Sequence, residues 1–108
     1  MKIVFFGTPL FAVPFLEALT REKDFEVVSV VTQPDKPSGR GGKITSPEVE
    51  VFAEQNNIPV LQFQSLKKTK AIETLSTLDA DLFVVVAYGK MIPGAILDIP
   101  SKGAINVH

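Results

Sequence analysis

The chain has 108 residues, of which 45% are hydrophobic, and a formal net charge of -1, which suits one α/β domain of ordinary composition. It contains no cysteine, which excludes disulfide bonds, thiolate nucleophiles and cysteine metal sites, and its single histidine disfavours a zinc site. Because no apolar run approaches the roughly 20 residues that span a bilayer, and because a near-zero charge argues against binding nucleic acid over the whole surface, we expect a cytoplasmic protein without membrane contact.

The first third of the chain alternates strand-like and helix-like segments. Residues 2–6 form an apolar run that ends at a Gly-Thr-Pro turn, which predicts a first strand. Hydrophobic residues then recur at helical spacing over residues 11–22, and Pro14 falls in the first turn, where a helix tolerates proline. The β-branched run at residues 25–32 predicts a second strand. This order is typical of a parallel βαβ unit.

A segment without apolar periodicity follows. Residues 33–46 are rich in proline and glycine, which predicts a long loop. Ser46, Pro47 and Glu48 then predict the start of a helix that runs to about residue 57. In this interpretation Ser46 is the N-cap, and the acid lies near the positive end of the helix dipole.

The second half continues the alternation. Residues 59–61 predict a short strand, residues 66–78 a surface helix, and residues 93–97 one or two helical turns. The strongest strand signal is the continuous apolar run at residues 81–87, which is typical of a central strand covered on both faces. Residues 104–108 begin a fifth strand.

These elements predict a Rossmann-like α/β fold, a doubly wound parallel sheet of about five strands. In such sheets, ligands bind beyond the carboxyl ends of the strands, near the point where the strand order reverses. The first strand ends at residues 7–9, the fourth at residues 87–90, and the fifth carries Asn106. Turn residues and unusual polar residues therefore gather at one edge of the predicted sheet.

Asn106 and His108 lie two positions apart in the last predicted strand, so their side chains emerge on one face. A neutral amide donor beside an imidazole suits acyl transfer, in which a carbonyl oxygen gains negative charge while a nucleophile loses a proton. The alternative interpretation is structural, with Asn106 as a strand-end cap and His108 as a terminal residue without a chemical role.

Three basic residues, Lys36, Arg40 and Lys43, lie close together in the predicted loop. The glycines between them let the backbone approach a partner, so the loop suits the phosphates of a large anionic substrate. The same charges also fit a solvated loop without a partner.

Two glycine-bearing turns were compared with nucleotide-binding motifs. Residues 7–9 open a helix and could hold an anion, but they lack the later glycines of a dinucleotide fingerprint. Residues 39–43 do not meet the spacing of a Walker phosphate loop. Nucleotide hydrolysis and dinucleotide binding are therefore not expected.

Four segments closely resemble, in order and spacing, methionyl-tRNA formyltransferases. They read MKIVFFGTP at residues 1–9, TQPDKPSGRG at 32–41, VVVAYGKMIP at 84–93 and GAINVH at 103–108, and the resemblance covers the whole chain. Leu10 stands where the family usually carries an acid. The basic loop is also one residue shorter and has one lysine fewer, so we expect a differently shaped contact with tRNA.

The resemblance implies transfer of a formyl group from 10-formyltetrahydrofolate to the amino group of methionine on initiator tRNA, without a metal. It assigns Asn106 and His108 to catalysis, where with a later aspartate they would stabilise negative charge on the formyl oxygen. The residues that would line the folate pocket are Tyr88, Gly89, Lys90, Met91, Ile92 and Pro93. Those that would contact tRNA are Gly7, Thr8, Pro9, Lys36, Arg40 and Lys43.

The family continues past this histidine with a Ser-Leu-Leu-Pro segment, the catalytic aspartate and a carboxy-terminal barrel. We therefore expect residues 1–108 to be the amino-terminal part of the catalytic domain, inactive alone and prone to self-association through uncovered apolar surface. One alternative is a sugar-nucleotide N-formyltransferase, which residues 33–41 disfavour because they resemble the tRNA-type loop. Another is a short, non-catalytic protein that binds a folate-like ligand or a partner chain.

Overall fold

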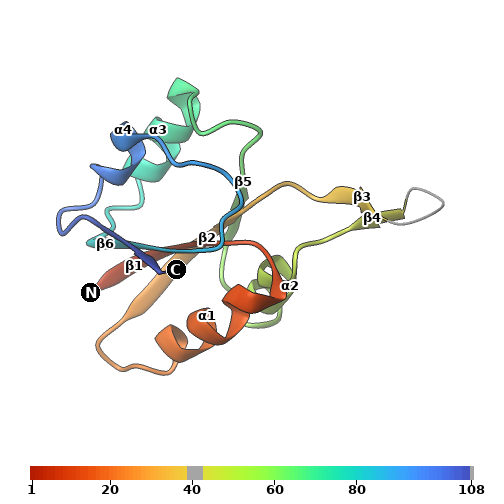
Figure 1. Ribbon diagram of the computed structural model, residues 1–108. Helices are drawn as coiled ribbons and strands as arrows, with labels where there is room; N and C mark the ends of the chain where they lie inside the picture. Colours follow the sequence, from red (N-terminus) through yellow and green to blue (C-terminus); the bar gives the residue numbers. More distant parts are fainter. Residues whose placement is uncertain (39–42, 108) are drawn as a thin grey trace.

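The computed structural model describes residues 1–38 and 43–107 and contains a five-stranded parallel sheet between two layers of helices (Figure 1). Its strands, in the spatial order β5-β2-β1-β6-β7, are β1 (Lys2–Gly7), β2 (Glu26–Thr32), β5 (Val60–Gln62), β6 (Leu82–Val86) and β7 (Ala104–Val107). Its helices are the 3₁₀ turn η1 (Leu10–Ala12), α1 (Val13–Thr20), α2 (Glu48–Gln55), α3 (Thr69–Ser76) and α4 (Gly94–Leu97). The predicted doubly wound α/β sheet is confirmed.

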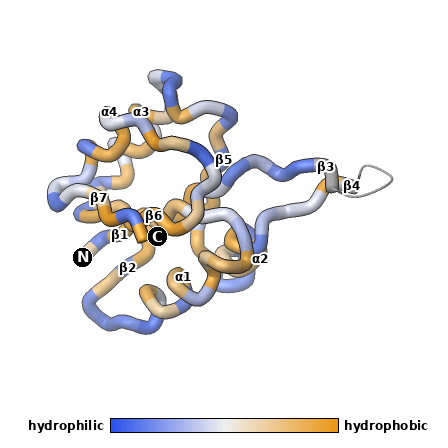
Figure 2. The backbone as a smooth tube through the Cα atoms, in the orientation of Figure 1, coloured by the Kyte–Doolittle hydropathy of each residue, from blue (hydrophilic) through white to orange (hydrophobic). Residues whose placement is uncertain are grey.

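Each face of the sheet is covered by one pair of helices, α1 and α2 on one face and α3 and α4 on the other (Figure 1). Because successive side chains of a strand point to opposite faces, β6 contributes to both layers. Val84 and Val86 belong to the core beneath α1 and α2, whereas Phe83 and Val85 belong to the core beneath α3 and α4. Figure 2 shows hydrophobic residues concentrated along the central strands. β6 is therefore central and buried on both sides, as its continuous apolar run predicts.

The segment predicted as a long loop contains two short strands, so that part of the prediction is wrong. β3 (Lys36–Ser38) and β4 (Lys43–Thr45) pair antiparallel, and the resulting ribbon projects away from the sheet (Figure 1). Lys36, Ile44 and Thr45 are exposed. Because these positions of β3 and β4 do not pack against a core, the sequence shows no alternation of apolar residues that would predict the two strands.

The predicted N-cap of α2 is also wrong by one residue. The carbonyl oxygen of Pro47 accepts the hydrogen bond from the Val51 amide at 3.1 Å, which makes Pro47 the N-cap. The hydroxyl of Ser46 instead donates to the Oδ2 atom of Asp35 at 3.3 Å. The Ser46 side chain, which the local pattern assigned to capping the helix, is therefore bonded to Asp35 instead.

The helices described are short, and α1, α2 and α3 have eight residues each. α3 begins at Thr69 rather than at Leu66, because Ser65 forms a turn in which its hydroxyl oxygen accepts a hydrogen bond from the Lys67 amide at 3.1 Å. Over residues 1–38 and 43–107, no helix has the length and apolar character needed to cross a membrane.

Candidate functional site

The strand order reverses between β1 and β6. From β1 the chain builds β2 and β5 on one side, and then it crosses to β6 and β7 on the other side. The carboxyl ends of β1 and β6 consequently lie side by side, with Gly7 paired to Val86. Ligands of open α/β sheets bind at such a reversal.

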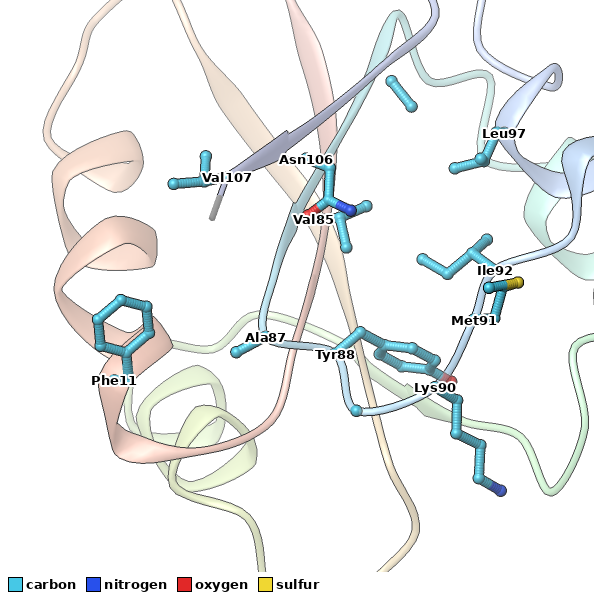
Figure 3. A pocket seen from close by; sticks show the side chains of 12 residues that line it. Phe11, Val85, Ala87, Tyr88, Lys90, Met91, Ile92, Leu97, Asn106 and Val107 are labelled. Carbon is cyan, nitrogen blue, oxygen red and sulfur yellow. The ribbon is translucent and has the colours of Figure 1, made fainter.

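A cavity of about 580 Å³ opens at these strand ends (Figure 3). It is lined by Phe11, Val85, Ala87, Tyr88, Gly89, Lys90, Met91, Ile92, Leu97, Ala104, Asn106 and Val107. Most of these side chains are apolar, and Asn106 adds an uncharged amide. Pockets for drug-sized ligands have volumes of about 300–1,000 Å³ and combine apolar walls with a few polar groups. The cavity therefore suits a mainly apolar ligand that also carries a polar group.

Asn106 lies on the face of the sheet that α3 and α4 cover. It pairs with Val85, whose side chain packs in the core beneath those helices, and paired residues of parallel strands share a face. Ala104, two residues earlier on β7, lines the same cavity. Figure 3 shows the Asn106 amide beside the open space that Tyr88 and Ile92 border. The Asn106 amide is therefore exposed on the cavity wall, and its catalytic role stays a prediction; His108 lies outside the described residues.

The turn after β6 forms one wall of the cavity and has an unusual backbone. Ala87 has a φ of 52° and Gly89 a φ of 101°, so two of three successive residues occupy the left-handed region. Between them, Tyr88 is only 3% exposed, and its ring lies edge-on to Phe6 with 5.7 Å between centroids. Burial raises the pKa of the Tyr88 phenol above its ordinary value. The ring therefore packs into the core and supports the wall.

Thr8 fastens this turn to the end of β1. Its hydroxyl donates a hydrogen bond to the carbonyl oxygen of Tyr88 at 2.7 Å and accepts one from the amide of Gln33 at 3.3 Å. One side chain thus joins the carboxyl ends of β1, β2 and β6. The hydroxyl of Thr8 is occupied within the fold, and the contact of Thr8 with tRNA stays a prediction.

The other residues predicted for the folate pocket follow this turn. Gly89, Lys90, Met91 and Ile92 line the large cavity, and Met91 is 93% exposed. In Figure 3 the Lys90 side chain extends away from the cavity, and its Nζ atom lies 3.5 Å from the carbonyl oxygen of Gln64. Pro93 lines a neighbouring cavity of about 100 Å³ and is the N-cap of α4.

The residues predicted to contact tRNA are divided between the sheet edge and the ribbon. Thr8 and Lys36 line a second cavity, of about 160 Å³, at the base of the ribbon. Pro9 is exposed at the start of η1, whereas Gly7 is buried at the end of β1. Lys43 begins β4.

Arg40 lies outside the described residues. Of the residues that the structure describes, Thr8 at the end of β1 is joined to the turn at Tyr88 by the hydrogen bond between them.

Sequence reasoning missed part of the cavity lining. Phe11 was counted toward the apolar stripe of a helix, but it is 60% exposed and lines the large cavity. Leu97 reaches the cavity from α4. A signal for Phe11 existed in its position two residues after the first Gly-Thr-Pro turn, at the edge where ligands bind.

A polar cluster at the base of the ribbon was also missed. The Nε2 atom of Gln62 lies 2.9 Å from Oδ1 of Asp35 and 2.7 Å from Oε2 of Glu50. Burial, and then a hydrogen bond with Asp35, raise the pKa of Glu50 to about 7. The hydrogen bonds from Glu50 and Gln62 lower the pKa of Asp35. These residues come from three separate elements, so no local sequence pattern joins them.

Among the residues that the structure describes, no group of three or more histidine, aspartate or glutamate side chains could hold a metal ion. The described residues at this edge include the amide of Asn106 and the apolar walls of the cavity.

Comparison with known proteins gives a consistent result. A family model described as formyl transferase matches residues 1–108. The chain is 54% identical over its whole length to a methionyl-tRNA formyltransferase of Acetivibrio thermocellus, and 53% identical to one of Trichormus variabilis. It is 52% identical to one of Citrifermentans bemidjiense. The chain covers 34%, 33% and 34% of these proteins, so it spans about a third of the length of the curated relatives that it matches.

Proposed function

Since the chain belongs to the formyl transferase family, we propose that the protein transfers a formyl group from 10-formyltetrahydrofolate to the amino group of methionyl initiator tRNA. The relatives named above carry the name of this activity. The observation that carries the proposal is the position of Asn106, an uncharged amide on the wall of an apolar cavity at the reversal of strand order.

The cavity fits the formyl donor in size and chemistry. Its volume of about 580 Å³ accommodates a pterin with part of its tail, and its walls from Met91, Ile92 and Leu97 are apolar. The turn at residues 87–89 brings backbone groups to the same wall, where they can bind the polar edge of a heterocycle. We propose that Tyr88 through Ile92 hold the donor, with the Tyr88 ring acting from behind the wall.

When bound, 10-formyltetrahydrofolate supplies an activated formyl carbonyl. The Asn106 side chain would donate a hydrogen bond to the formyl oxygen, which gains negative charge as the amine of methionine attacks. An uncharged donor on a rigid strand is suited to this task, because it requires no change of protonation and little reorganisation. As the bond from the formyl carbon to N10 of the donor breaks, the amine loses a proton and N10 gains one, so that tetrahydrofolate leaves. We assign assistance with this proton movement to His108 on the strength of the sequence alone.

The ribbon and the turn after β1 form the proposed surface for tRNA. Lys36 of β3 is exposed beside the small cavity at the base of the ribbon, and Arg40 and Lys43 follow in sequence. Cations that bind phosphates fix the register of a nucleic acid, so these residues would position the acceptor end of tRNA. Residues 7–9 connect this surface to the wall of the large cavity.

We also propose a cytoplasmic location and self-association of residues 1–108 when they are produced alone. Ile105 on the outermost strand β7 is 51% exposed, and Leu10 and Phe11, which follow the carboxyl end of β1, are also exposed. Exposed apolar surface beside a strand edge favours pairing with a second copy. Light scattering of residues 1–108 that shows a monomer at every concentration would count against this part of the proposal.

The activity is tested with the full-length protein, 10-formyltetrahydrofolate and two acceptors, methionyl initiator tRNA and a nucleotide-linked amino sugar. Formylation of the methionyl tRNA alone supports the proposal. Formylation of the sugar alone would replace it with a sugar-nucleotide N-formyltransferase. If neither acceptor is formylated while folate still binds the protein, a non-catalytic binding role replaces both.

A further inference from the structure

The ribbon β3–β4 is joined to the domain through a carboxyl pair at its base. Asp35 directly precedes β3, and Ser46 directly follows β4, so the two residues stand on the two legs of the ribbon. The Ser46 hydroxyl donates to Oδ2 of Asp35 at 3.3 Å, and Gln62 of β5 donates to Oδ1 at 2.9 Å. The Asp35 carboxylate therefore ties both legs to the edge strand of the sheet.

Glu50 of α2 completes this attachment. Its Oε2 atom lies 2.7 Å from Nε2 of Gln62, and the same nitrogen lies 2.9 Å from Oδ1 of Asp35, so one amide brings the two carboxyl groups together. Two carboxyl groups can form a hydrogen bond only if one of them keeps its proton. Glu50 is only 8% exposed, whereas Asp35 is half-buried and accepts from both Ser46 and Gln62. The proton therefore resides on Glu50 and is donated to Asp35.

We propose that Glu50 is a positioning residue for the β3–β4 ribbon. Its protonated carboxyl group binds Asp35 and thereby holds the ribbon against α2 and β5. When the proton leaves, two negative charges face each other across the same contact, and the hydrogen bond between them is lost. The ribbon then remains attached only through the hydrogen bonds of Gln62 and Ser46 to Asp35, beside the two carboxylates that repel each other.

Burial of Glu50, and then the charged groups around it, determine the direction of the pH response. Asp35 faces it from the connection between β2 and β3, and Glu54 lies one turn further along α2; both are acids and disfavour its ionisation. The ion pair found among the described residues, between Arg21 and Glu17, is on α1. The pKa of Glu50 is about 7 against an ordinary value of 4.5, so the stabilisation is complete below 4.5 and is lost as the pH rises through about 7.

The consequence for tRNA rests on the proposed function, whereas the attachment of the ribbon does not. If the ribbon positions tRNA, then the affinity for tRNA falls over the same rise in pH that releases the Glu50 proton. The two statements are measured separately, so that one can fail without the other.

The test is amide hydrogen exchange of β3 and β4 in the full-length protein, corrected for the intrinsic effect of pH on exchange. In the wild type we expect protection at about pH 6 to exceed that at about pH 8 by about tenfold, which is the linkage expected for the shift of Glu50. The Glu50→Gln variant keeps a neutral donor without a titrating proton, so its protection should be high at both values. The Glu50→Ala variant should be poorly protected at both.

The matched control is Glu73→Gln, which removes an exposed acid from α3 on the other face of the sheet and should retain the pH response of the wild type. If the wild type and the Glu50→Gln variant were equally protected at both pH values, the proposal would be overturned. A Glu50 carboxyl group that titrates at its ordinary pKa in carbon NMR would overturn it as well. If exchange behaves as expected but the affinity for tRNA does not follow it, the positioning role stands and the ribbon's proposed contact with tRNA falls.

Discussion

The hydroxyl of Thr8 donates a hydrogen bond of 2.7 Å to the carbonyl oxygen of Tyr88, a residue 80 positions away in the sequence. The bond spans the point where the strand order reverses, and the same hydroxyl accepts the Gln33 amide. It therefore holds the cavity wall in place from the end of β1. Because Ala87, the residue before Tyr88, has a φ of 52°, which is unfavourable for a residue with a Cβ atom, this wall needs such restraint to keep its shape.

Replacing Thr8 by valine removes the hydroxyl group, so the Tyr88 carbonyl and the Gln33 amide each lose this hydrogen-bond partner. We expect Thr8→Val to lower the free energy of unfolding by about 1–3 kcal/mol and to weaken binding of the formyl donor. The control is Thr20→Val, because the exposed Thr20 hydroxyl bonds only locally, to the carbonyl oxygen of Glu17 at 2.7 Å. Denaturant unfolding measures both variants, and equal midpoints for them would contradict this role of Thr8.

Gly7 is required by the close approach of β1 to its surroundings. A Cβ atom at this position would lie 2.7 Å from Cε2 of Phe5 and 2.8 Å from the carbonyl oxygen of Val86. The second contact is with backbone and cannot be relieved by a rotamer change, so we expect Gly7→Ala to cost about 1–3 kcal/mol or more.

Gly94, in α4, supplies the matched control for that substitution. A Cβ on Gly94 meets no atom of the described residues within 4 Å, so Gly94→Ala should be neutral or stabilising by up to about 1 kcal/mol. Thermal or denaturant unfolding of the two variants is the measurement. A Gly7→Ala protein as stable as Gly94→Ala would show that the sheet edge is looser than described.

Strand and helix periodicity predicted most of this fold because the central strands β1, β2 and β6 are largely buried and carry the apolar runs of the chain. β6 is the clearest case, since Phe83 to Val86 are buried on alternating sides. The ribbon escaped prediction for the opposite reason, because Lys36, Ile44 and Thr45 are exposed and carry no pattern of burial. Local chemistry was similarly insufficient at Ser46, whose partner Asp35 lies 11 residues away.

The cavity could be predicted in part because ligands of parallel sheets bind at the carboxyl ends of strands. That rule placed Asn106 and the turn at Tyr88 on one edge, where both line the cavity. It could not indicate that Tyr88 is buried against Phe6 or that the Thr8 hydroxyl is occupied. The pair of Glu50 and Asp35 depends on packing of α2 beside the ribbon, which no spacing in the sequence encodes.

The phenol of Tyr88, the single tyrosine of the chain, should ionise above its ordinary pKa of 10.0. Burial, the main cause, favours the protonated form in the folded state, so the associated stability is present below pH 10.0 and is lost as the pH rises beyond it. An ultraviolet difference titration of the full-length protein against its Tyr88→Phe variant measures this ionisation. A phenol that titrates at 10.0 or below would mean that the cavity wall is open to solvent.

Met91 should contribute to binding without contributing to stability. Its side chain is 93% exposed and lines the large cavity, so Met91→Ser should weaken the formyl donor by about 0.5–1.5 kcal/mol and leave unfolding unchanged. The control is Val51→Ser, which makes the same kind of change to an exposed apolar side chain on α2, away from the cavity, and should leave the affinity for the donor unchanged. Calorimetric titration with a folate analogue separates the two variants, and equal affinities would remove Met91 from the binding surface.

The most direct test of the central claim is the rate of formyl transfer by the full-length protein with Asn106→Ala, measured beside its unfolding midpoint. Because the Asn106 side chain is exposed on the cavity wall, the substitution should leave the midpoint unchanged. Loss of one preorganised donor to a developing negative charge should reduce kcat by about 10²–10³-fold. A folded variant that formylates methionyl-tRNA at the rate of the wild type would contradict the assignment of this cavity as the site of formyl transfer.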